Sequence, residues 1–158
     1  RGAPVRLEVT RHELEQPRTE VEGLEDPPGT LRPDGGHGLE HIKYANLPRV
    51  LDEFHRVLSL GSELYLAVPD FSVLCDLYRK GIPLTMIRGA LNGGQEYPEN
   101  IHYSTWDFSS LHDLLTKHGY RSICRYDAKL FLPPSGYFDW SIGRIAGRPI
   151  SLNVRAQV

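Results

Sequence analysis

Two segments of this sequence, residues 37–41 and 93–106, hold side chains that could do chemistry. His102 lies in the second segment, and because an unperturbed imidazole titrates near neutral pH, it could act as a general base toward a hydroxyl or an amine. The neighbours that could bind an acceptor molecule are Gly93, Gly94, Gln95, Asn100, Tyr103 and Trp106. Alternatively, these side chains pack the loop onto the domain, with His102 hydrogen-bonded to the backbone.

The tripeptide Gly93-Gly94-Gln95 has two interpretations. Two glycines allow backbone to approach a substrate closely, and a glutamine amide offers neutral hydrogen-bonding groups. The same tripeptide occurs in peptide release factors, which are ribosome ligands. This chain has a formal net charge of −2, whereas a ribosome ligand needs positive charge to bind RNA. A substrate-binding loop is therefore the favoured interpretation.

The first segment reads His37-Gly38-Leu39-Glu40-His41, which matches the H-x-x-E-H pattern of one metalloprotease class. That pattern binds zinc through two histidines one helical turn apart. Gly38 and the glycines before it weaken the helix that this geometry requires, and no acidic third ligand is evident. The sequence therefore predicts no metal site.

The composition places these segments in an ordinary globular domain, with 40% hydrophobic and 24% charged residues. The eight tyrosines, five phenylalanines and two tryptophans all lie between Tyr44 and Trp140. Residues 1–38 are rich in charge, proline and glycine, so we expect a poorly ordered N-terminal segment there, apart from a short strand at 5–9. Residues 39–158 form the second predicted unit.

Helical and strand patterns alternate in that second unit, which predicts a layered α/β domain with a largely parallel sheet. Asn46, Asp70 and Asp107 stand where helix N-caps are expected. The predicted helices are 47–58, 71–80, 84–91 and one that starts after Asp107 and ends before Gly119. The predicted strands are 64–68, 121–126 and 150–154.

Several of these pieces resemble class I S-adenosylmethionine-dependent methyltransferases of type 11. The resemblance begins with Glu40-His41-Ile42, a pair that follows the fourth strand in that family. It continues in residues 53–64, which read Glu-Phe-His-Arg-Val-Leu-Ser-Leu-Gly-Ser-Glu-Leu, and in Val68-Pro69-Asp70, which closes the fifth strand. It continues through Gly93-Gly94-Gln95, Asn100-Ile101-His102 with Trp106-Asp107, and residues 111–120, and it ends at residues 151–156.

The resemblance implies a partial Rossmann-like fold that holds the later strands and helices of the sheet. The glycine-rich first strand unit has no counterpart before residue 39, and Leu31-Arg32-Pro33-Asp34 stands where an apolar fourth strand is expected. Glu40 and His41 would lie at the lip of the cofactor cleft, or else form a solvated helix start. We therefore expect this C-terminal portion to bind S-adenosylmethionine weakly or not at all.

The implied function is methyl transfer to an oxygen or nitrogen of a small molecule or glycan. The alternative is a non-catalytic remnant or subunit that associates with another chain through an exposed sheet edge. The balanced charge argues against nucleic-acid binding, no apolar run is long enough to predict a membrane span, and two well-separated cysteines suit the cytoplasm.

Overall fold

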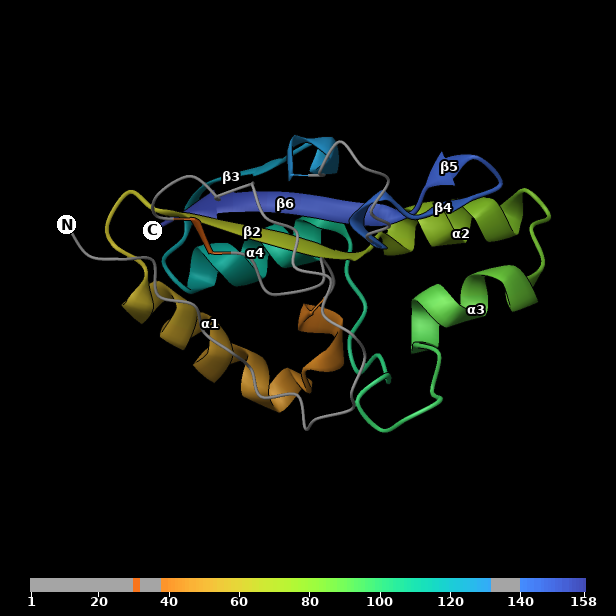
Figure 1. Cartoon of the computed structure of the whole chain (residues 1–158), viewed down its shortest axis with the longest axis horizontal. Helices are drawn as coiled ribbons and strands as arrows, with labels where there is room; N and C mark the ends of the chain where they lie inside the picture. The colour runs from red at the N-terminus through yellow and green to blue at the C-terminus, as the bar shows by residue number, and fades with distance from the viewer. Residues whose placement is uncertain (1–29, 32–37, 132–139) are drawn as a thin grey trace, which may run out of the picture.

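The computed structural model describes residues 30–31, 38–131 and 140–158 (Figure 1). The predicted N-terminal segment lies outside the described residues except for Thr30, Leu31 and Gly38, and so does the strand expected at 5–9. Among the helices of the described part, none is long and apolar enough to cross a membrane.

The four predicted helices are confirmed with small changes at their ends. They are α1 (Leu47–Val57), α2 (Phe71–Arg79), α3 (Leu84–Asn92) and α4 (Phe108–Lys117). Asp70 and Asp107 cap α2 and α4, since each side chain accepts a hydrogen bond from a backbone N–H of the first turn. Asn46 makes no such bond, because the three-residue 3₁₀ helix η2 (Tyr44–Asn46) leads directly into α1.

The main sheet has four strands in the order β1-β2-β6-β3. They are β1 (Thr30–Leu31), β2 (Glu63–Pro69), β3 (Arg121–Arg125) and β6 (Ser151–Gln157). The last strand, β6, lies between β2 and β3 and is antiparallel to both, with Pro69 opposite Ser151 and Glu63 opposite Gln157. A separate two-stranded hairpin joins β4 (Arg144–Ile145) to β5 (Arg148–Pro149).

This sheet corrects two sequence predictions. It is not largely parallel among the described strands, because only β1 and β2 run in the same direction. The segment before Glu40 also does contain a strand, since Thr30 and Leu31 pair with Glu63 and Leu64. A strand of two residues is too short to show an apolar run, so β1 cannot be recognised from the sequence pattern.

The principal core lies on one face of the sheet, where α1 and α4 cover β2 and β6 (Figure 1). Its fully buried residues include Leu51 of α1, Leu64 and Val68 of β2, Leu111 of α4 and Leu152 of β6. Burial of this kind contributes about 1.5–3 kcal/mol per large aliphatic side chain before entropy is counted. A second, smaller cluster joins α2 and α3 through Leu74, Leu77, Ile87 and Ile150.

Candidate functional site

The site begins with a single 3₁₀ turn, η1 (Leu39–His41), which packs against β2. Leu39 is the anchor of this turn, because it is 2% exposed and belongs to the principal core. Glu40 is completely buried and His41 is half-buried. Anchoring one residue of so short a turn fixes the direction of the next two side chains.

The loop between α3 and α4 is tied to this turn by direct hydrogen bonds. Tyr103 N donates to the Glu40 carbonyl oxygen at 2.7 Å, and Ser104 Oγ donates to the Leu39 carbonyl oxygen at 3.2 Å. Trp106 Nε1 donates to Ser104 Oγ at 2.9 Å, inside the core. Two segments that lie some sixty residues apart therefore form one rigid unit.

His102 is held by the end of α3. Its backbone N–H donates to the Asn92 carbonyl oxygen at 3.1 Å, and its Nδ1 lies 3.0 Å from the Ala90 carbonyl oxygen. Gly93 makes this close approach possible: its φ is +76°, and a Cβ there would collide with the Asn100 carbonyl oxygen. Only glycine adopts this conformation without strain and without a clash.

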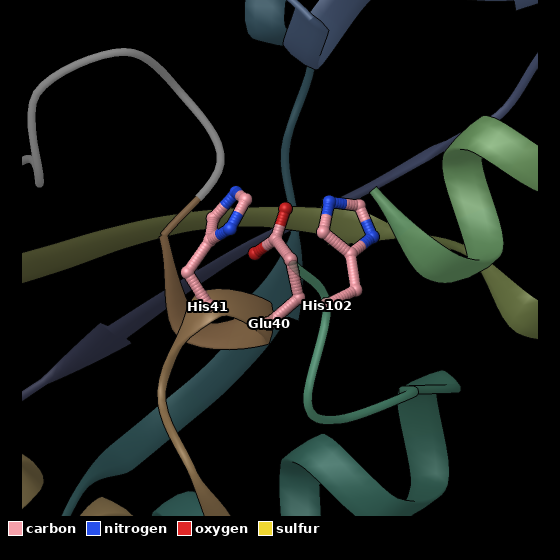
Figure 2. Close-up of side chains that lie close together, drawn as sticks. All are labelled: Glu40, His41 and His102. Carbon is pink, nitrogen blue, oxygen red and sulfur yellow. The ribbon is translucent and has the colours of Figure 1, made fainter. Parts of the chain in front are cut away.

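These two segments bring Glu40, His41 and His102 together (Figure 2). One ligand atom from each residue lies within 4.8 Å of the others. The two imidazole rings meet edge to face, with their centroids 4.7 Å apart, and Figure 2 shows the Glu40 carboxylate close to both rings. The residue predicted as catalytic and the two predicted at the cofactor therefore form one cluster.

The hydrogen bonds of the two histidines fix their proton positions. His41 Nδ1 lies 3.2 Å from the Ile101 carbonyl oxygen, and His102 Nδ1 lies 3.0 Å from the Ala90 carbonyl oxygen. A carbonyl oxygen only accepts, so Nδ1 must carry the proton in each ring. In the neutral form the lone pair of both imidazoles is then on Nε2, which can accept a proton or bind a cation.

The predicted acceptor loop partly folds back on itself. Gln95, at φ +62°, donates from Nε2 to the Asn92 carbonyl oxygen at 3.2 Å, and Asn100 Nδ2 donates to Glu96 Oε2 at 2.6 Å. Gly93 is buried and Gly94 is exposed, and with Arg88, Asn92 and Gln95 both glycines line a hollow of about 270 Å³. This hollow lies on the same loop as His102.

The aromatic residues of this loop have separate surroundings. Tyr103 is exposed, and Lys43 Nζ lies 5.5 Å from its ring centroid. Trp106 is 4% exposed and belongs to the core, with the exposed ring of Tyr44 tilted against it at 5.6 Å. Trp106 therefore supports the loop from inside. Lys43 and Tyr44 lie on this surface without having been predicted, because single polar or aromatic residues outside a motif give no sequence signal.

Asp70 lies at the start of α2, and Cys75 lies within that helix. Asp70 caps α2 as predicted, and its Oδ2 also accepts a hydrogen bond from Arg125 at 3.0 Å. Cys75 is exposed. It lines a small apolar groove between α2 and α3 with Phe71, Leu74, Tyr78, Leu84, Ile87 and Leu91.

Comparison with known proteins adds one distant likeness. No protein-family profile and no curated protein sequence matches this chain. A search of solved structures finds the crystal structure of a SAM dependent methyltransferase from Archaeoglobus fulgidus, at 14% identity and a TM-score of 0.44. The match covers 78% of this chain and 57% of that one, so the chain spans little more than half of that protein's length.

Proposed function

We propose that this chain is part of an S-adenosylmethionine-dependent methyltransferase whose acceptor is an oxygen or nitrogen of a small molecule or glycan. One observation carries the proposal: three segments that resemble the family meet in space. Tyr103 N donates to the Glu40 carbonyl oxygen, and Phe71 N donates to the Trp106 carbonyl oxygen at 2.9 Å. These bonds join the Glu40-His41 turn, the end of β2 and the 100–107 segment.

The position of these segments supports the proposal. β1 and β2 are parallel, and the Glu40-His41 turn and Asp70 both follow the carboxyl end of one of them. Open α/β sheets bind ligands beyond the carboxyl ends of their parallel strands. In the proposed enzyme, Glu40 and His41 border the cofactor and residues 93–103 border the acceptor.

His102 is the general base of the proposed reaction. Methyl transfer requires the acceptor atom to be in line with the sulfonium methyl group and to lose its proton as the new bond forms. The neutral His102 carries its Nε2 lone pair for that proton, because Nδ1 donates to Ala90. The electron pair of the broken methyl–sulfur bond leaves with the sulfur, which becomes a neutral thioether.

We further propose that the cofactor binds this chain weakly. The sequence has no glycine-rich turn after an apolar strand, and such a turn is what brings backbone close to a nucleotide-like ligand. The remaining contacts must overcome an association cost of about 4–15 kcal/mol. Calorimetric titration of the chain should therefore give a millimolar dissociation constant for S-adenosylmethionine, whereas a micromolar constant would contradict this part of the proposal.

A methyl-transfer assay tests the function itself. The chain is incubated with millimolar S-adenosylmethionine, labelled in the methyl group, and with mixtures of hydroxyl and amine acceptors. We expect incorporation above the rate without protein, and His102→Ala should lower turnover while the thermal midpoint changes little. No incorporation with any acceptor would contradict the catalytic proposal. It would favour the alternative of a subunit that associates through its sheet edge, which sedimentation would then detect.

A further inference from the structure

The cluster of Glu40, His41 and His102 has the composition of a metal site. Two imidazoles and one carboxylate are the protein ligands of many catalytic zinc centres, which keep a further position open. The same set, with several open positions, also binds other divalent transition metals. Magnesium and calcium prefer oxygen ligands, so two imidazoles and one carboxylate favour transition-metal ions such as Zn²⁺ over Mg²⁺ and Ca²⁺.

The geometry agrees with that composition. The three ligand atoms come from two segments that are bonded to each other, and they lie within 4.8 Å of one another. In a tetrahedral zinc site with bonds of about 2.0–2.1 Å, ligand atoms lie about 3.3 Å apart. Around an ion, the ligand atoms would therefore approach one another by up to about 1.5 Å.

The hydrogen bonds outside the cluster are an independent observation that points to a metal. A metal-binding histidine commonly donates its other ring N–H to a carbonyl or carboxylate, which fixes the tautomer and orients the ring. His41 and His102 both do so, through Nδ1 to the carbonyl oxygens of Ile101 and Ala90. Both rings are thus prepared to offer Nε2 to a cation.

We propose that Glu40, His41 and His102 bind a single divalent transition-metal ion with the preferences of zinc, through one carboxylate oxygen and both Nε2 atoms. This site differs from the H-x-x-E-H pattern, because His102 rather than His37 supplies the second imidazole. The ion would be bound by three protein ligands, with at least one position open to water or to an oxygen of a substrate. The binding of metal does not depend on the proposed methyl transfer. The two roles use the same Nε2 lone pair of His102, so His102 would not act as the general base while an ion is bound.

The test is metal binding by the whole chain after treatment with a chelator. We expect one Zn²⁺ per chain by calorimetry, and Co²⁺ should give visible absorption bands of a low-coordinate site. His41→Ala and His102→Ala should each weaken Zn²⁺ binding by about tenfold or more. Glu40→Gln should do the same, and the two histidine variants keep the test decisive if that buried substitution prevents folding.

Two control variants separate this site from other histidines. His112, on α4, is half-buried, and its Nδ1 lies 3.6 Å from Asp113 Oδ1, so it also pairs an imidazole with a carboxylate. His112→Ala and His37→Ala should leave the affinity for Zn²⁺ unchanged. Loss of binding in His37→Ala but not in His102→Ala would overturn the proposal in favour of the H-x-x-E-H pattern.

Nuclear magnetic resonance of the imidazole nitrogens gives a second readout that a purely structural role would not change. On addition of Zn²⁺, the Nε2 resonances of His41 and His102 should shift while both Nδ1 atoms stay protonated. Coordination through Nδ1, or no binding at millimolar Zn²⁺, would overturn the proposal. Metal binding without methyl transfer would contradict only the proposed function, and methyl transfer without metal binding would contradict only this inference.

Discussion

At the scale of single residues, Gly89 and Gly93 lie only four positions apart and have opposite effects on stability. Gly93 has a φ of +76°, and the Asn100 carbonyl oxygen leaves no room for a Cβ there. Gly89 lies within α3, and a Cβ at that position would have no other atom within 4 Å. A glycine in the first situation is required by the backbone, and one in the second is a cost to the helix.

Substitution by alanine should therefore have opposite effects at these two positions. Gly93→Ala should lower the free energy of unfolding by more than about 1 kcal/mol, because it adds strain and a clash. Gly89→Ala should raise it by about 0.5–1 kcal/mol, because alanine favours the helix. Urea denaturation of both variants measures the difference, and equal effects would mean that the turn at residue 93 is not formed as described.

Asp107 is the second residue whose role can be measured. Its side chain accepts from Ser110 N at 2.8 Å, while Ser110 Oγ accepts from Asp107 N at 3.1 Å, which completes a capping box at the start of α4. Asp107→Ala should lower the free energy of unfolding by about 1 kcal/mol. The exposed Ser109 lies on the same turn and is the matched control, since Ser109→Ala should change stability by less than about 0.5 kcal/mol.

The same cap should be sensitive to pH. Its hydrogen bonds with Ser110 hold the pKa of Asp107 below the ordinary aspartate value. A carboxyl whose pKa is lower in the folded state contributes stability above its unfolded pKa and loses it as the pH falls through the folded value. The difference in stability between the original chain and Asp107→Ala should therefore be constant near neutrality and shrink below about pH 4. A difference that grows in acid would have the wrong sign.

At the scale of elements, β2 carries the principal core. Leu66 is 3% exposed within it, whereas Leu60, in the turn just before the strand, is 91% exposed. Leu66→Ala should lower the free energy of unfolding by about 2–5 kcal/mol, and Leu60→Ala should change it very little. Thermal denaturation of the two variants compares the same substitution inside and outside the core. Similar midpoints would show that β2 is not the central buried strand.

Elements with strong local patterns are predicted correctly from the sequence, whereas the predicted direction of the strands is wrong. The spacing of Leu47, Leu51 and Phe54 predicts α1, and the apolar run of β2 predicts a strand buried on both faces. In β6, buried Leu152 and Val154 alternate with the more accessible Asn153. Such alternation is typical of antiparallel pairing, and it is the signal from which the mixed sheet could have been predicted.

The candidate site shows the same division. His102, Glu40 and His41 were each identified from the sequence, but their meeting depends on hydrogen bonds between two distant backbone segments. No local pattern encodes such a contact. The burial of Trp106 could not be predicted either, because an aromatic residue in a polar loop is as compatible with the core as with a binding surface.

At the scale of the whole molecule, the two hydrophobic clusters differ in size. The larger one unites α1, α4 and the sheet, and the smaller one holds α2 and α3 together beside the β4–β5 hairpin. Few buried contacts allow local opening at low free energy. Amide hydrogen exchange should therefore be faster in α3 than in β2 and β6, and equal protection would show that the two clusters unfold as one.

The position of β6 has a consequence for how this chain is made. β6 lies between β2 and β3 in space but follows both in the sequence, so neither of the earlier strands can join the other until residues 151–157 exist. During translation, the edge of β2 that pairs with β6 stays unpaired until the last of the described strands has been synthesised. Until then the unpaired edge of β2 can be bound by chaperones or can pair with strands of other chains in aggregates. Nascent chains arrested before residue 151 should be sensitive to protease on the ribosome. Longer chains, in which β6 has left the exit tunnel, should be resistant.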